Sequence, residues 1–180
     1  MSQPEMPRPG KLFLSILSSR WELFQEELLR ALSQQFGRVD FESPFIPLTE
    51  TDYYNRELGT PIFRRIYTFY PLVELSGLPE IKLVTNKLEE KYLRDKKRLF
   101  NLDPGLLTLE RLVLGTGKNF THRIYLDQGI WADLTLIFAR GDWVDLPWTF
   151  PDYASEKIKT HLREIRTNYR EQLQKAATTK

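Results

Sequence analysis

Apolar and polar residues in the first quarter of the chain follow two different periods. Residues 11–18 form a short, almost wholly apolar run, which is typical of a buried strand. The next segment has an apolar residue at every third or fourth position, which predicts the buried face of a helix: Trp21, Phe24, Leu28, Leu32 and Phe36. Gly37 suits the C-terminus of that helix, and residues 39–42 predict a second strand. The chain is therefore expected to open as strand, helix, strand.

The next strand and helix are predicted in the middle of the chain. Pro44 and Pro47 interrupt regular structure. Residues 61–73 are rich in β-branched and aromatic side chains, as in a long strand. A second helical stripe begins after Gly77 and runs into a basic cluster at residues 94–98. Positive side chains stabilise the partly negative C-terminus of a helix, so we expect the helix to end there.

The remainder of the chain is patterned mainly as strands. Asp103-Pro104-Gly105 has the composition of a turn. Two apolar runs flank Asp127-Gln128-Gly129, and Gly129 can supply the positive φ that a short hairpin connection needs. The elements predicted after the first turn are strands at 106–114, 123–126, 130–138 and 143–146 and a helix at 158–173.

This order of elements predicts an α+β fold, with an antiparallel or mixed sheet packed by helices. A ferredoxin-like core with an added β-hairpin is the version we favour. The length of 180 residues suits one domain. We expect a flexible leader at residues 1–10, a single α+β domain at residues 11–175 and a frayed tail at residues 176–180.

Composition narrows the class of protein. The chain is 41% hydrophobic and has no cysteine, which excludes disulfides, thiol nucleophiles and thiolate metal sites. No apolar run approaches the roughly 20 residues that a membrane span needs. The net charge of +2 is small for a nucleic-acid binder, so nucleic acid is a disfavoured partner that stays open. These features predict a soluble cytoplasmic protein without a membrane partner.

The predicted hairpin carries the first candidate site residues. In a symmetric register Asp133 faces Arg123 across the two strands, and His122 directly precedes Arg123. One interpretation is a cross-strand ion pair of little energetic value. The other is a polar pocket on one sheet face, in which His122 is suited to general base chemistry. His122 and Asp133 are therefore catalytic candidates, and Arg123 is a ligand-binding candidate.

The loop Gly115-Thr116-Gly117-Lys118-Asn119 resembles part of a phosphate-binding turn. Its glycines let backbone N–H groups approach an anion, and Lys118 adds a positive charge. The P-loop pattern is broken, because Leu112 replaces its first glycine and Asn119 replaces its magnesium-binding Ser or Thr. We expect at most a simpler anion-binding turn, with Lys118 as its ligand-binding residue.

Three further residues are candidates for separate reasons. Glu110 falls among apolar neighbours in a predicted strand, where a carboxylate must be paired or neutralised, so it is a third catalytic candidate. Trp148 and Tyr153 belong to a stiff segment, 146–153, rich in proline and aromatic residues. This segment is either a strap across the sheet or an aromatic wall of a ligand site. The two histidines lack metal-ligand spacing, so no metal site is predicted, and the cofactor is unknown.

Several short motifs resemble one bacterial family. They are Asp52-Tyr53-Tyr54-x-x-Glu57-Leu58-Gly59, Lys82-Leu83-x-Thr85-Asn86, Leu102-Asp103-Pro104-Gly105, His122-Arg123-Ile124-Tyr125-Leu126 and Trp148-Thr149-Phe150-Pro151-Asp152-Tyr153. Together they resemble the domain-of-unknown-function family 4416 over most of the chain. The resemblance implies a bacterial, cytosolic protein and carries over no catalytic residue. A GTP-binding label attached to some relatives finds no support in this chain, because the motifs of a GTPase are missing.

Two functions from different classes follow from these observations. The first is a small-ligand site on the polar face of the sheet, for an anionic, nucleotide- or phosphometabolite-like molecule. Its residues would be the aromatic segment together with Glu110, Lys118, His122, Arg123 and Asp133. The second is a non-enzymatic module whose basic cluster and aromatic segment dock on a protein or RNA partner. We favour the first, and the sequence does not specify whether a reaction follows binding.

Overall fold

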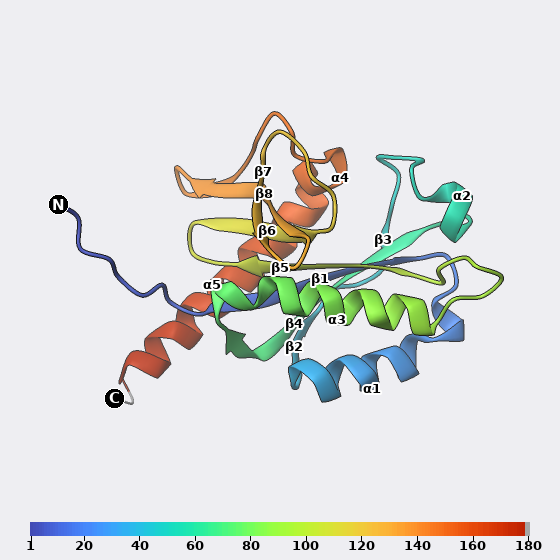
Figure 1. Ribbon diagram of the computed structural model, residues 1–180, viewed down its shortest axis with the longest axis horizontal. Coiled ribbons are helices and arrows are strands. Elements are labelled where there is room, and N and C mark those ends of the chain that lie inside the picture. Colours follow the sequence, from blue (N-terminus) through green and yellow to red (C-terminus); the bar gives the residue numbers. More distant parts are fainter. Residues whose placement is uncertain (179–180) are drawn as a thin grey trace.

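Nine strands within residues 1–178 form one antiparallel sheet, and helices pack on both of its faces (Figure 1). The computed structural model describes residues 1–178. The chain is thus an α+β protein, as its pattern of elements predicts.

The first half of the chain builds a four-stranded core with two long helices. Its main elements are β1 (Gly10–Ser18), α1 (Gln25–Phe36), β2 (Val39–Glu42), β4 (Phe63–Val73), α3 (Leu78–Lys91) and β5 (Asn101–Leu107). The strands lie in the order β2-β4-β1-β5, and both helices pack on one face. This is the arrangement of a ferredoxin-like βαββαβ unit. The short elements are the 3₁₀ helices η1 (Trp21–Leu23) and η2 (Leu75–Gly77), the strand β3 (Ile46–Pro47) and the helix α2 (Asn55–Leu58).

The second half extends the sheet beyond β5. Its elements are β6 (Arg111–Thr116), β7 (Arg123–Asp127), β8 (Ile130–Ala139), β9 (Asp142–Asp145), α4 (Pro151–Ala154) and α5 (Glu156–Thr178). β6 pairs with β5 and β8 pairs with β6, while β7 and β9 pair with different parts of β8. The long helix α5 then packs on the face opposite α1 and α3.

β1 is buried along its whole length because helices cover both of its faces. Leu12, Leu14 and Ile16 contribute to the core under α1 and α3. Phe13 belongs to the second core, which contains the apolar face of α5. Successive side chains of a strand point to opposite faces, so a strand covered on both sides is apolar throughout.

The predicted turn at Asp103-Pro104-Gly105 is wrong, because these residues lie inside β5. β6 pairs only with residues 105–107, so the first part of β5 has a free side. The backbone N–H and C=O of Leu102 face that side, where they bind side chains of α3. Pro104, two residues further on, points the same way. Its missing N–H therefore removes no hydrogen bond from the sheet.

The chain turns instead at residues 108–110. Thr108 N–H donates to the Arg111 carbonyl at 2.9 Å and closes the turn without glycine or proline. Glu110 is therefore an exposed turn residue, and its predicted position among apolar neighbours within a strand is wrong. A carboxylate in this position is solvated by water and needs no buried partner.

The two ends of the chain differ in their structure. Residues 1–9 form no helix or strand, and Tyr169 Oη donates a hydrogen bond to the Pro9 carbonyl at 2.7 Å. Helix α5 continues through residues 176–178, which belong to the predicted tail, and residues 179–180 lie outside the described residues.

Candidate functional site

A charged pair lies at the centre of the β7–β8 hairpin. The register places Arg123 opposite Asp133, as the symmetric hairpin predicts, and Arg123 Nε donates to Asp133 Oδ2 at 2.8 Å. Asp133 is only 4% exposed, so its carboxylate needs the partner that it has. Leu114, opposite Asp133 on β6, belongs to the core under α5. The pair therefore lies on the α5 side of the sheet.

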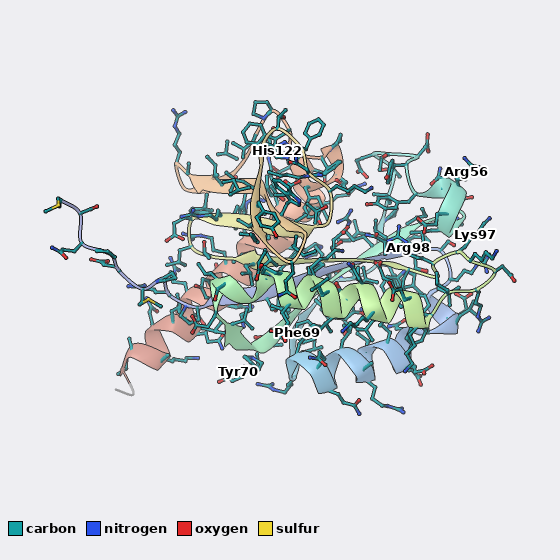
Figure 2. All side chains as sticks on the ribbon, in the orientation of Figure 1. Arg56, Phe69, Tyr70, Lys97, Arg98 and His122 are labelled. Atoms are coloured by element: carbon teal, nitrogen blue, oxygen red, sulfur yellow. The ribbon has the colours of Figure 1, made fainter. Side chains whose placement is uncertain are left out.

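His122 joins this pair just before β7 begins. Its Nε2 lies 3.4 Å from Asp133 Oδ2, and its ring stacks on Trp148 with centroids 5.0 Å apart and planes inclined by 12°. This Nε2 is buried, and among the described residues no group meets it with hydrogen-bond geometry. The contact with Asp133 is thus close but poorly aligned. In Figure 2 His122 lies in the region of β7 and β8, well away from Arg98.

The loop 117–122 connects this cluster to the segment before α2. Arg123 Nη1 donates to the Lys118 carbonyl at 3.0 Å, and Lys118 Nζ donates to Tyr53 Oη at 3.0 Å. Lys118 Nζ also lies 5.5 Å from the centroid of the Tyr53 ring. Within residues 1–178 the Lys118 ammonium forms no salt bridge; it helps to lower the pKa of Glu57, but that carboxylate is paired directly with Arg98.

The segment 146–153 is a strap fixed across β8. Trp148 Nε1 donates to the Leu134 carbonyl at 2.8 Å, and Thr149 Oγ1 donates to the Thr135 carbonyl at 2.6 Å. Trp148 remains 39% exposed and Phe150 remains 51% exposed. The two interpretations of this segment are therefore compatible, because the strap is anchored while part of its aromatic surface reaches solvent.

Tyr153 lies in a separate, buried polar cluster. Arg64 Nη1 on β4 donates to Ser15 Oγ at 2.7 Å, and Arg64 Nη2 pairs with Asp152. The guanidinium of Arg64 lies 4.7 Å from the centroid of the Tyr153 ring. Burial raises the pKa of Tyr153 well above its ordinary value of 10.0, so its hydroxyl stays protonated. The sequence analysis does not predict the pair of Arg64 and Asp152. The signal for it in the sequence is the position of Arg64 within the largely apolar stretch 61–73.

Arg98, from the predicted basic cluster, is engaged in a network of ion pairs. Its Nε and Nη2 donate to the two carboxylate oxygens of Glu57 at 2.6 and 2.7 Å, and Nη1 donates to Glu89 at 3.1 Å. Hydrogen bonds from Arg98 hold the pKa of Glu57 below its ordinary value of 4.5, whereas burial raises the pKa of Glu89. The other residues of the cluster, 94–97, are exposed, and Figure 2 labels Lys97 among them.

The structure brings together most, but not all, of the predicted site residues. Glu110 lies apart, in the lining of a cavity of about 900 Å³ that also touches Leu78, Leu126 and Tyr169. Tyr153 packs against Arg64 instead of the hairpin. The predicted residues that do lie together are Lys118, His122, Arg123, Asp133 and Trp148.

No three His, Asp or Glu side chains within residues 1–178 are arranged to hold a metal ion. In the same part of the chain, no helix has the length and apolar character needed to cross a membrane.

The fold and the cluster together define a ferredoxin-like α+β protein whose sheet is extended by a hairpin carrying charged and aromatic residues. A model of the family described as a domain of unknown function, DUF4416, matches residues 8–169, and the chain belongs to this family. No curated protein and no solved structure matches the chain.

Proposed function

We propose that the protein binds a small anionic ligand, nucleotide- or phosphometabolite-like, at the loop 117–122 and the rings beside it. One observation carries the proposal: the Lys118 ammonium hydrogen-bonds to a neutral hydroxyl and forms no salt bridge within residues 1–178. We also propose that the protein is bacterial, as the resemblance to the family implies, and cytoplasmic, in keeping with the absence of cysteine.

The loop around Lys118 has the features of a simple anion site. Arg123 is held by Asp133 and binds the Lys118 carbonyl, so Arg123 positions the loop. Gly117 has open space where a side chain would begin, so an anion can approach the backbone there. A phosphate at Lys118 would gain charge-assisted hydrogen bonds, which are stronger than those between neutral groups.

The exposed rings beside the loop favour a nucleotide among the anionic ligands. Phe120 is 61% exposed, and Trp148 presents part of its surface to solvent. Aromatic side chains stack on nucleobases without strong sequence preference. His122 has its Nε2 buried against Asp133, so we assign it no proton transfer and propose binding without assigning a reaction.

Thermal denaturation of the purified protein with ATP, GMP or inorganic phosphate tests the proposal. A ligand at 100 times its dissociation constant stabilises the folded state by about 2.7 kcal/mol, which gives a measurable shift in Tm. We expect Lys118→Ala to abolish the shift. Lys87→Ala removes an exposed lysine of α3 and is expected to keep it.

Trp148→Ala separates the two parts of the proposed site. If a base stacks on Trp148, this variant weakens the shift caused by a nucleotide and leaves the shift caused by inorganic phosphate unchanged. A protein that no anion stabilises, or a Lys118→Ala variant that keeps the full shift, overturns the proposal.

Docking on a macromolecule is the second candidate function. It is favoured by the apolar residues that the hairpin exposes, above all Ile124, which is 70% exposed. The basic cluster supports RNA binding less than the sequence suggests, because Arg98 is already paired with Glu57 and Glu89. Association with RNA that weakens steeply with added salt would favour this candidate.

A further inference from the structure

The strand β7 is at the edge of the sheet, and its exposed residues are apolar. β7 pairs with β8 on one side and with no other strand within residues 1–178. Ile124, Tyr125 and Leu126 are 70%, 53% and 39% exposed. Natural edge strands are commonly protected by charges, proline or a covering element, because their free backbone groups can pair with another chain. An apolar centre on a free edge therefore points to a partner strand.

We propose that β7 pairs with β7 of a second copy of this chain, in an antiparallel ladder centred on Tyr125. The strand reads Arg-Ile-Tyr-Leu-Asp. Around a two-fold axis at Tyr125, Arg123 lies opposite Asp127 of the second copy, and Ile124 lies opposite Leu126 of the second copy. Every position thus meets a complementary one, because opposite charges and apolar pairs both stabilise cross-strand neighbours.

The charged groups at the two ends of β7 have capacity for this pairing. Arg123 uses Nε for Asp133 and Nη1 for the Lys118 carbonyl, which leaves Nη2 without a hydrogen bond among the described residues. Asp127 is exposed, and its Oδ1 accepts only the neighbouring Gln128 N–H at 2.8 Å. Each dimer would gain this ion pair twice while keeping the pair between Arg123 and Asp133.

The apolar residues of β7 would be covered in the same dimer. Ile124 is opposite Ala132 and Tyr125 is opposite Trp131, so the two side chains point to different faces of the sheet. The Tyr125 ring already packs edge-on against Trp131, with centroids 5.2 Å apart. Pairing with a second β7 would cover part of both exposed side chains, and burial of apolar surface is the main favourable contribution in most associations.

Sedimentation measured over a range of concentrations tests for the dimer. The monomer has a mass of 21.3 kDa, and we expect a species of twice that mass to increase with concentration. Ile124→Lys places a charge on the edge and is expected to raise the dimer dissociation constant at least about tenfold. Leu93→Lys makes the same kind of change at an exposed leucine after α3 and is expected to leave the dissociation constant unchanged.

A cross-link tests the register independently of that substitution. The chain has no cysteine, so Tyr125→Cys introduces a unique thiol. Directly opposite residues in antiparallel strands have Cα atoms about 4.5–5.5 Å apart, within reach of a disulfide. Under mild oxidation we expect Tyr125→Cys, but not Leu93→Cys, to form a covalent dimer. β7 shifts its register on β8 between Tyr125 and Asp127, so the cross-link is placed at Tyr125, before the shift, where it reports the pairing at the two-fold axis.

The outcomes separate this proposal from the proposed anion site. A protein that stays monomeric, or a Tyr125→Cys variant that cross-links no faster than Leu93→Cys, overturns the β7 dimer. Neither result affects the Tm shift expected from anions at Lys118, because the substitutions at Ile124 and Tyr125 leave Lys118 in place together with Arg123, which holds its loop and takes part in both proposals.

Discussion

Arg64 is a charged residue near the start of the largely apolar strand β4, and it is 2% exposed. It is paired with Asp152, which lies 88 residues further along the chain. A buried charge that loses its partner is strongly unfavourable, so this pair ties α4 to β4. The sequence shows the unusual arginine, but it does not show which of its many carboxylates is the partner.

Glu57 is expected to make the stability of the protein sensitive to acid. Its pKa is held below the ordinary value of 4.5, chiefly by hydrogen bonds from Arg98. A carboxylate with a lowered pKa contributes stability that is present above its unfolded pKa and lost as the pH falls through its folded pKa. We therefore expect Glu57→Gln to flatten the acid side of a plot of unfolding free energy against pH, measured by urea denaturation from about pH 3 to pH 7.

Glu90→Gln is the matched control for Glu57→Gln. Glu90 is an exposed residue of α3, so its substitution should leave the shape of the plot as it is in the parent protein. The prediction is contradicted if both variants change the acid side equally.

Among the secondary-structure elements, β5 departs most from its sequence pattern. Asp-Pro-Gly is a turn signal when only neighbouring residues are considered, yet here it lies in a strand. The strand can contain proline at this point because β6 leaves the first part of β5 unpaired. The helices were easier to predict, because their apolar stripes depend on residues three or four apart. Strand boundaries depend on which neighbouring strand is present, and that information is distant in the sequence.

The free side of β5 is completed by side chains of α3. Lys82 Nζ donates to the Leu102 carbonyl at 2.8 Å, and Glu89 accepts from the Leu102 N–H. We expect Lys82→Met to lower the free energy of unfolding by about 1–3 kcal/mol, because a buried carbonyl loses its donor. Lys87→Met on the same helix is exposed and should change this free energy by less than about 0.5 kcal/mol in urea denaturation. Equal losses for the two variants would rule out the role assigned to Lys82.

Across the molecule, the two larger cores share the strands of one sheet. One core lies under α1 and α3 and contains Trp21, and the other lies under α5 and contains Trp143. β1 contributes alternate side chains to both cores. Neither core can therefore lose its packing without disturbing the strand that the other needs.

This sharing predicts one cooperative unfolding transition for the two cores. Variants that keep only Trp21 or only Trp143, with the other tryptophans changed to Phe, report on each core by fluorescence. In each variant we expect the urea midpoint from tryptophan fluorescence to equal the midpoint from far-ultraviolet circular dichroism. Leu162→Ala in α5 should lower both midpoints, since a buried Leu→Ala change costs about 2–5 kcal/mol. Separate midpoints for the two tryptophans would contradict the prediction.

Local patterns in the chain were sufficient for the α+β class, the main helices, the β7–β8 hairpin and the pairing of Arg123 with Asp133. Each of these depends on residues that are close in sequence, where period and turn composition determine the geometry. The folded chain was needed for the contact of Lys118 with Tyr53, the network around Arg98 and the isolation of Glu110. Lys118 and Tyr53 are 65 residues apart, and Arg98 and Glu57 are 41 apart. Such contacts form only when several strands have taken their places, because no local preference encodes which distant side chain will be the neighbour.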